Sequence, residues 1–265
     1  MINIEKPGAP CWLDIGSPDT AASSNFYGAV LGWEFMSAGP DAGGYGIWKT
    51  GGETVAGVGP LTDEGAKSGW IVYYNVPDIQ EATETVRSSG GTVRVEPMDM
   101  MGQGHMAQYT DPTGGQFAVW QAAPGAATDD DIRVDAPGAL TWVELYTTDG
   151  ATAQSFYQRL FGWQITDMPL PGDGPERYHI LTVAGGNPEK DGHGGMMVMS
   201  AGDLPGGHAY WSPVFETTDC DRDAAQVTAA GGTLQMGPAD MEGVGKVATC
   251  LDPFGASFSL ITSVG

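Results

Sequence analysis

Apolar and polar side chains follow a fixed order at the start of the chain. Residues 11–15 are a short run of aromatic and β-branched residues, which predicts a strand. A turn follows, and Asp19 is placed to cap a helix that ends at Gly32. Apolar residues lie four apart on one face of this helix, in the pairs Phe26 with Val30 and Tyr27 with Leu31. Three short strands separated by glycines are expected next, so the order is strand, helix, three strands.

The same order begins again near residue 70. Residues 70–76 predict a strand, Asp78 caps a helix with Glu81 three residues on, and Gly90 ends that helix. Three more strands are expected at residues 92–95, 105–109 and 116–120. The first half of the chain is therefore predicted to contain two strand-helix-three-strand (βαβββ) units.

The second half of the chain repeats the first. Two segments recur 141 residues later. Gly90-Gly91-Thr92 recurs as Gly231-Gly232-Thr233, and Asp111-Pro112 recurs as Asp252-Pro253. Closer to the start of the chain the spacing is 130: Trp12 recurs as Trp142, and Phe26-Tyr27 recurs as Phe156-Tyr157. Tyr45 matches Tyr178 at a spacing of 133, so the extra residues of the second copy fall between elements. A repeat of this size indicates a duplicated domain.

Residues 122–137 separate the two copies. They hold Pro124-Gly125 and the acidic run Asp129-Asp130-Asp131 without apolar periodicity, as a linker does. We expect a first domain at residues 1–122, a linker at 123–136 and a second domain at 137–265.

These features resemble the vicinal oxygen chelate superfamily, which includes glyoxalase I, extradiol dioxygenases, fosfomycin-modifying enzymes and bleomycin-resistance proteins. Both halves carry the matching pieces: the first helix with its Phe-Tyr pair and final Gly-Trp, the second helix followed by Gly-Gly-Thr, and the Asp-Pro turn before the last strand. The chain is most similar to tandem-domain actinobacterial proteins called glyoxalase-like or hydroxylase. The resemblance implies an α+β fold of two tandem glyoxalase-like domains, each made of two βαβββ units that form a cupped mixed sheet.

Metal-using members of that superfamily hold a divalent ion on the cupped sheet, typically through His, Gln and Glu. The resemblance places the equivalent positions at Trp12, Ile71 and Ala118 in the first half, and at Trp142, Ser212 and Ser259 in the second. Indole, alkyl and methyl groups offer no lone pair to such an ion, and a serine hydroxyl is a weak ligand. We therefore expect no metal site and no cofactor.

Side chains alternate between the two faces of a strand, so residues two apart from these positions share the concave face. Both halves place a tryptophan at the first position and a carboxylate two residues beyond it. These carboxylates, Asp14 and Glu144, are the candidate catalytic residues. The candidate ligand-binding side chains are Trp12, Tyr73, Asn75, Gln116, Trp120, Trp142, Ser212, Glu216 and Ser259. A second interpretation stays open, in which the tryptophans fill a former cavity and the carboxylates reach solvent or bond a backbone group.

Charge narrows the class of partner. The chain has 11 Lys and Arg against 33 Asp and Glu, a net charge of −22, which disfavours binding to nucleic acid or to acidic membrane surfaces. The sequence shows no hydrophobic signal segment and no apolar stretch long enough to span a bilayer, so we expect a cytoplasmic protein. It also lacks the nucleophile-elbow, Walker and dinucleotide glycine motifs.

Two functions from different classes follow. The first is a metal-free protein that binds a hydrophobic or aromatic small molecule in a Trp-walled cup, as sequestering or bleomycin-resistance proteins do. The alternative is an enzyme of secondary or carbonyl metabolism, a glyoxalase-like lyase or isomerase or a hydroxylase or dioxygenase-like protein. It would use Asp14 or Glu144 as acid or base, or an atypical metal site. In either case we expect a monomer or a weak homodimer, because tandem duplication supplies two domains in one chain.

Overall fold

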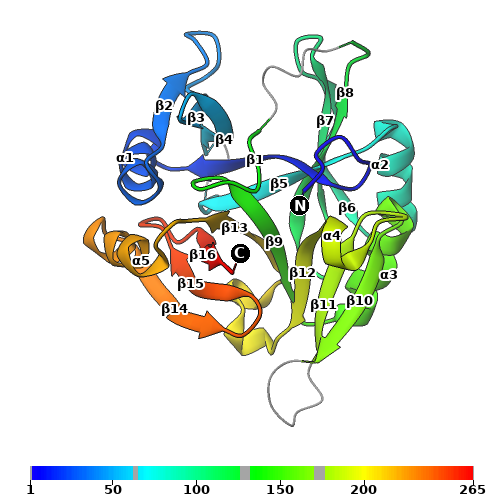
Figure 1. The fold of residues 1–265 in the computed structure, drawn as a ribbon. Helices are drawn as coiled ribbons and strands as arrows, with labels where there is room; N and C mark the ends of the chain where they lie inside the picture. Colours follow the sequence, from blue (N-terminus) through cyan, green and yellow to red (C-terminus); the bar gives the residue numbers. More distant parts are fainter. Residues whose placement is uncertain (1, 62–64, 126–131, 170–176, 265) are drawn as a thin grey trace. The chain divides into compact units, whose positions relative to one another are not determined.

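Strands dominate the structure, a computed structural model that describes residues 2–61, 65–125, 132–169 and 177–264 (Figure 1). The first mixed sheet has the order β2 (Glu34–Ser37), β3 (Gly46–Thr50), β4 (Glu53–Pro60), β1 (Pro10–Ser17), β5 (Gly69–Asn75), β8 (Gln116–Ala122), β7 (Gly104–Thr110) and β6 (Thr92–Asp99). The second has the order β10 (Gln164–Pro169), β11 (Arg177–Thr182), β12 (Gly192–Val198), β9 (Leu140–Thr147), β13 (Tyr210–Glu216), β16 (Ser257–Ser263), β15 (Gly245–Leu251) and β14 (Thr233–Met241).

The helices begin and end where the sequence places its caps. They are α1 (Thr20–Leu31), α2 (Ile79–Ser88), α3 (Gly150–Phe161), the short α4 (Pro188–Asp191) and α5 (Cys220–Ala229), with two 3₁₀ turns at Ala201–Asp203 and Pro205–Gly207. The Asp19 carboxylate accepts a hydrogen bond from the backbone N–H of Ala22 at 2.9 Å, and Gly32 ends α1 with a φ of 71°, in the left-handed region that favours glycine. Within the described ranges, none of the helices is long and apolar enough to cross a membrane.

The predicted fold class is confirmed, because each half of the chain contributes two βαβββ units to one eight-stranded sheet. Both sheets are mixed. Strand β1 pairs with β4, β5 with β8, β12 with β9 and β13 with β16 in parallel, whereas hairpins such as β3–β4, β7–β8, β11–β12 and β15–β16 are antiparallel. The predicted boundaries between domain, linker and domain stay a prediction. Residues 126–131 of the expected linker lie outside the described residues.

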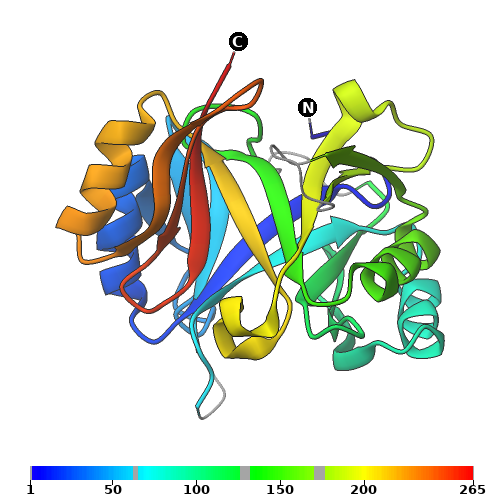
Figure 2. The same cartoon turned by 90° about the horizontal axis from the view of Figure 1, so that it is seen from below.

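Contacts along the chain divide it into two compact units, each of which draws on both halves of the sequence. Unit 1 comprises Met1–Trp12, Val72–Asp129 and Trp142–Trp211, and unit 2 comprises Leu13–Ile71, Asp130–Thr141 and Ser212–Gly265. Within unit 1, helix α2 packs beside α3, and within unit 2, α1 packs beside α5 (Figure 2).

Unit 1 is built around a buried tyrosine and a buried aspartate. The Tyr157 hydroxyl, on α3, donates to the Asp111 carboxylate at 2.7 Å, and Trp211 Nε1 donates to the Tyr157 oxygen at 2.9 Å. Asp111 belongs to the Asp-Pro turn before β8, so a helix of the second half is bonded to a turn of the first. The rings that contact Tyr157 are Phe117, Phe156, Phe161, Trp163 and Trp211, and Tyr74 packs on Trp211.

Unit 2 repeats this arrangement with the halves exchanged. The Tyr27 hydroxyl, on α1, donates to the Asp252 carboxylate at 3.3 Å, and Trp70 Nε1 donates to the Tyr27 oxygen at 3.1 Å. The rings that contact Tyr27 are Phe26, Trp33, Trp48, Trp70 and Phe258. Burial raises the pKa of the Asp252 carboxyl, although the backbone N–H groups of Ala256 and Phe254 oppose that rise. In each unit, the tyrosine of a Phe-Tyr motif is therefore hydrogen-bonded to the aspartate of an Asp-Pro motif from the other half of the chain.

His193, on β12, is buried in the core of unit 1 beside Trp163, with the two ring centroids 4.9 Å apart. Among the described residues, neither ring nitrogen has a hydrogen-bond partner. Burial lowers the pKa of this imidazole to about 3, because the charged form cannot be solvated there.

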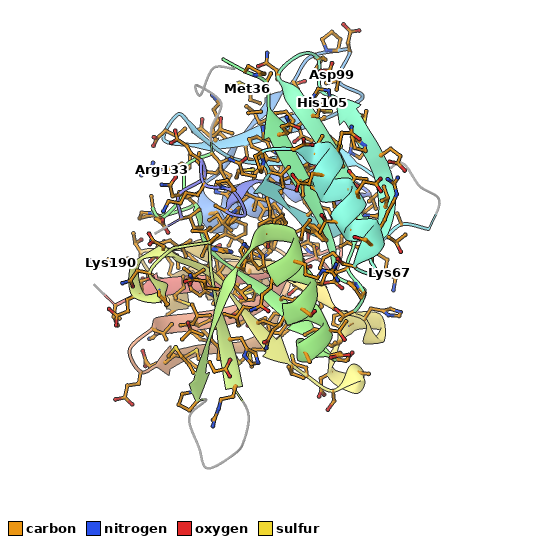
Figure 3. The ribbon with its side chains drawn as sticks, turned by 90° about the vertical axis from the view of Figure 1, so that its right-hand side faces the viewer. Met36, Lys67, Asp99, His105, Arg133 and Lys190 are labelled. Carbon is orange, nitrogen blue, oxygen red and sulfur yellow. The ribbon has the colours of Figure 1, made fainter. Side chains whose placement is uncertain are left out.

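We expect His193 to make the fold sensitive to acid. The unfolded chain takes up a proton near the ordinary pKa of 6.5 whereas the folded chain does so near 3, so stability is lost as the pH falls through this interval. Between pH 7 and pH 5 the loss from this group is about 2 kcal/mol. Denaturant unfolding at the two pH values should therefore show a smaller loss in His193→Leu than in the wild type. The control is His105→Leu at the exposed His105, which faces Asp99 across β6 and β7 (Figure 3). Equal losses in the wild type and in His193→Leu would contradict this assignment.

Candidate functional site

Strand β9, within unit 1, carries a run of polar and aromatic side chains on one face. Trp142, Glu144 and Tyr146 are two residues apart, so they point to the same side of the sheet. Val143 and Leu145, which point to the other side, are completely buried in the core. Trp142 and Glu144 are half-buried, and Tyr146 is 8% exposed.

Hydrogen bonds join these side chains to Tyr178 on β11, which is separated from β9 by strand β12. Trp142 Nε1 donates to the Tyr178 hydroxyl oxygen at 2.7 Å, and that hydroxyl donates to Glu144 Oε1 at 3.0 Å. The Tyr146 hydroxyl donates to the other oxygen, Glu144 Oε2. The ring of Tyr146 also stacks on Tyr210, with centroids 5.1 Å apart and planes at 28°. We call Trp142, Glu144, Tyr146, Tyr178 and Tyr210 the Glu144 cluster.

Two glycines of β12 make room for the cluster. Gly195 lies opposite Glu144 in the parallel pairing of β12 with β9, and a Cβ at position 195 would lie 1.8 Å from the Tyr178 hydroxyl oxygen. A Cβ at Gly192 would lie 3.2 Å from Trp142 Cη2. The glycine-rich sequence of β12 therefore allows the rings of Tyr178 and Trp142 to cross directly over its backbone.

Burial sets the proton affinity of the cluster. It raises the pKa of the Glu144 carboxyl above its ordinary value, and the hydrogen bonds from Tyr146 and Tyr178 act in the opposite direction. Burial also raises the pKa of both phenols well above 10, and the nearby negative charge of Glu144 adds to that rise. The phenols therefore stay protonated as donors, while Glu144 is a stronger base than a solvent-exposed carboxylate.

The first half contains a smaller version of this arrangement, within unit 2. The Tyr45 hydroxyl donates to Asp14 Oδ2 at 3.5 Å, and a Cβ at Gly57 would lie 2.0 Å from the Tyr45 oxygen. Gly16 takes the position of Tyr146, and a Cβ there would lie 2.7 Å from a methyl group of Leu61. The second half thus adds a phenol beside the carboxylate where the first half has no side chain.

The other candidates of the first half lie in unit 1. Tyr73 pairs with Ala118, and Asn75 with Trp120, across β5 and β8, so these side chains share one face as predicted. The Asn75 amide donates to the Ile4 carbonyl at 3.1 Å and so fastens the start of the chain. Gln116 is exposed, Trp12 is partly exposed, and a Cβ at Gly104 would lie 2.6 Å from the Trp120 ring.

The remaining candidates of the second half lie in unit 2. Ser212 and Ser259 are at most 1% exposed; the Ser212 hydroxyl bonds that of Ser257 at 3.2 Å, and the Ser259 hydroxyl donates to Thr249 at 3.4 Å. The Glu216 carboxylate accepts from the backbone N–H and the hydroxyl of Ser263, at 3.0 and 2.6 Å. A ligand-binding role for these residues, as for the rest of the predicted set, stays a prediction.

Three members of the Glu144 cluster were missing from the sequence-based set. Tyr146 obeys the same alternation as Glu144 and would have been included by extending the rule two residues further along the strand. The signal for Tyr178 is its match with Tyr45 in the repeat, together with a glycine on the next strand in both halves. Tyr210 had no such signal, because its ring meets Tyr146 from a distant part of the sequence.

Two hollows lie elsewhere on the surface. One, of about 300 Å³, is lined by Ser89, Ala151, Thr152, Ser155, Phe156 and Arg159. The other, of about 460 Å³, lies by the turn between β14 and β15, where Lys246 pairs with Asp221 at 2.5 Å. Their lining residues are distinct from those of the Glu144 cluster. The cluster brings together more convergent polar groups, so the chemistry of a binding site is strongest there.

Comparison with known proteins identifies the family. The chain matches the Glyoxalase/Bleomycin resistance protein/Dioxygenase superfamily over residues 12–119 and 139–260. It belongs to this superfamily. It is 34% identical over 270 residues to the anthracycline biosynthesis protein DauV of Streptomyces sp. (strain C5), an alignment that covers 96% of this chain and 93% of DauV. It is 32% identical over 262 residues to the putative glyoxylase CFP32 of Mycobacterium bovis, covering 97% and 95%.

Solved structures of the superfamily share the fold. The 2,3-dioxygenase LapB from Pseudomonas sp. KL28 superposes with a TM-score of 0.65 at 15% identity, covering 98% of this chain and 94% of LapB. The Mn(II)-bound glyoxalase from Novosphingobium aromaticivorans superposes with a TM-score of 0.63 at 17% identity, covering 98% and 83%. At these identities the likeness establishes the fold alone.

In the second half, the positions that hold metal ligands in metal-using members of the superfamily carry side chains that do not fit a divalent ion. Trp142 uses its only polar atom to donate to Tyr178, and an indole N–H has no lone pair for a metal. The hydroxyls of Ser212 and Ser259 are buried and already bonded to other hydroxyls. In the described part of the chain, no three His, Cys, Asp or Glu side chains gather where they could hold a metal ion.

Proposed function

We propose that this protein binds a flat aromatic small molecule on the face of the Glu144 cluster, without a divalent metal ion. The observation that carries the proposal is the convergence of an indole, a carboxylate and two phenols on one face of β9 and β11. Aromatic side chains offer a large apolar surface to a planar ligand, and a few polar groups among them fix its orientation.

The name of one relative favours a ligand of this shape. DauV is named as an anthracycline biosynthesis protein, and anthracyclines are built on a planar system of fused rings. The partly exposed indole of Trp142 is the kind of surface on which such a ring stacks. Binding without turnover would be the behaviour of a sequestering protein.

The proposal is tested by titrating the purified protein with 2-hydroxyanthraquinone while the tryptophan fluorescence is recorded. We expect saturable quenching with one probe bound per chain, and the same affinity in the presence of a metal chelator. Quenching that does not saturate would contradict binding. An affinity abolished by the chelator and restored by a divalent ion would contradict the metal-free part of the proposal.

The raised pKa of Glu144 favours a second candidate function, that of an acid-base enzyme of carbonyl or secondary metabolism. A half-buried carboxylate whose pKa is raised by burial can remove a proton from an acidic ligand. The reaction class would be that of a glyoxalase-like isomerase or lyase, or of a hydroxylase or dioxygenase-like protein. Turnover of a bound aromatic that is lost in Glu144→Gln, with binding retained, would favour this candidate over sequestration.

A further inference from the structure

Three side chains of the Glu144 cluster, Trp142, Tyr146 and Tyr178, donate their polar hydrogens to other members of the cluster. An indole and a phenol each carry one polar hydrogen, and an ionised carboxylate accepts hydrogen bonds but donates none. The hydrogen of Trp142 goes to Tyr178, and the hydrogen of Tyr178 goes to Glu144. The hydrogen of Tyr146 goes to the other oxygen of Glu144. The hydrogen bonds thus converge on the carboxylate from two sides, from Trp142 through Tyr178 and directly from Tyr146.

This hydrogen-bond network offers hydrogen-bond acceptors, rather than donors, to a ligand. A carboxylate has about four lone-pair sites, and two of them are filled by Tyr146 and Tyr178. A ligand carbonyl or ether oxygen placed against these oxygens would face lone pairs, whereas a hydroxyl hydrogen would complete the set. We infer that the ligand presents a hydroxyl donor, a phenol or enol on the edge of its aromatic ring, to the carboxylate of Glu144. This inference rests on the proposed function and names the chemical group that the same site selects.

A neutral donor suits this environment better than a cation. Glu144 sits among aromatic rings, where an ammonium group would have to lose its hydration before pairing. A phenol gives up less hydration and adds a third hydrogen bond of the kind that Glu144 already accepts twice. The first half lacks this environment, because Gly16 replaces Tyr146 and the contact between Tyr45 and Asp14 is long, at 3.5 Å.

A matched pair of probes tests the inference. 2-Hydroxyanthraquinone and 2-methoxyanthraquinone share one ring system, but only the first has a hydroxyl hydrogen. We expect the wild-type protein to bind the hydroxyl probe at least about tenfold more tightly, the effect of one hydrogen bond to a charged group. In Glu144→Gln, which keeps the shape but removes the charge, we expect this preference to fall to about threefold or less. Glu34→Gln, the same change at an exposed position, serves as the control and should keep the full preference.

The outcomes separate this inference from the proposed function. If neither probe binds the wild type, the proposed function itself fails. If both bind equally well, the site takes aromatic ligands but does not select a donor, and the inference is overturned. It is also overturned if Asp14→Asn, rather than Glu144→Gln, removes the preference. Circular dichroism and a denaturation curve of Glu144→Gln establish that the variant is folded.

Discussion

Asp111→Ala is expected to lower the free energy of unfolding by about 3–5 kcal/mol, the loss typical of removing one partner from a buried charged network. Asp111 is 3% exposed and accepts four hydrogen bonds. Two come from Thr113, through its backbone N–H at 2.7 Å and its hydroxyl at 2.8 Å. The others come from the Gly115 N–H at 3.0 Å and the Tyr157 hydroxyl at 2.7 Å. Alanine would leave these donors without this acceptor, and two of them, the Gly115 N–H and the Tyr157 hydroxyl, are buried in unit 1.

Urea denaturation of matched variants measures this loss. Asp41→Ala removes an exposed carboxylate and should change the unfolding free energy by less than about 0.5 kcal/mol. Asp252→Ala removes the equivalent carboxylate of unit 2, where the bond to Tyr27 is longer, at 3.3 Å, so we expect a smaller loss than in Asp111→Ala. A loss below about 1 kcal/mol in Asp111→Ala would show that the Asp-Pro turns do not carry the stability of the units.

The repeat and the local patterns were enough to predict the fold class. Helix caps such as Asp19 and Asp78, together with glycines at helix ends, act within a few residues, so their effect can be recognised in a single segment. The pairing of Tyr157 with Asp111 could not be predicted in the same way. Periodicity shows that Tyr157 faces a core, but it does not show that this core is supplied by the other half of the chain.

Local patterns also placed some members of the Glu144 cluster on the correct strand face, but they did not show which distant residues bond to them. Strand alternation placed Trp142 and Glu144 on one face of β9, and the structure has them there. It did not indicate that Tyr178, on β11, would bond to both of them across the backbone of Gly195. Ser212 and Ser259 were predicted to face a ligand, and the structure finds their hydroxyls buried and bonded to neighbouring strands. Sequence alternation gives the side of a sheet, whereas accessibility depends on what packs against it.

Trp142→Ala is expected to weaken binding of 2-hydroxyanthraquinone by about 100-fold, the effect of losing a central aromatic contact. The indole supplies the partly exposed ring of the cluster and also holds the Tyr178 hydroxyl through Nε1 at 2.7 Å. Trp142→Phe separates these roles, because it keeps a ring but removes the N–H. We expect it to lose about tenfold or less, since stacking on the ring is largely retained. Phe35→Ala, which removes a ring that is 46% exposed on β2, should leave the affinity unchanged.

The dissociation constant of 2-hydroxyanthraquinone, measured by equilibrium dialysis for the wild type, Trp142→Ala and Trp12→Ala, tests the central claim most directly. These two tryptophans occupy equivalent positions in the two halves, so the comparison asks which half holds the ligand. If the ligand binds on the face of the Glu144 cluster, Trp142→Ala should greatly weaken its affinity, and Trp12→Ala should change that affinity by about threefold or less. Unchanged affinity in Trp142→Ala, with or without a loss in Trp12→Ala, would contradict the claim that the ligand binds on the face of the Glu144 cluster.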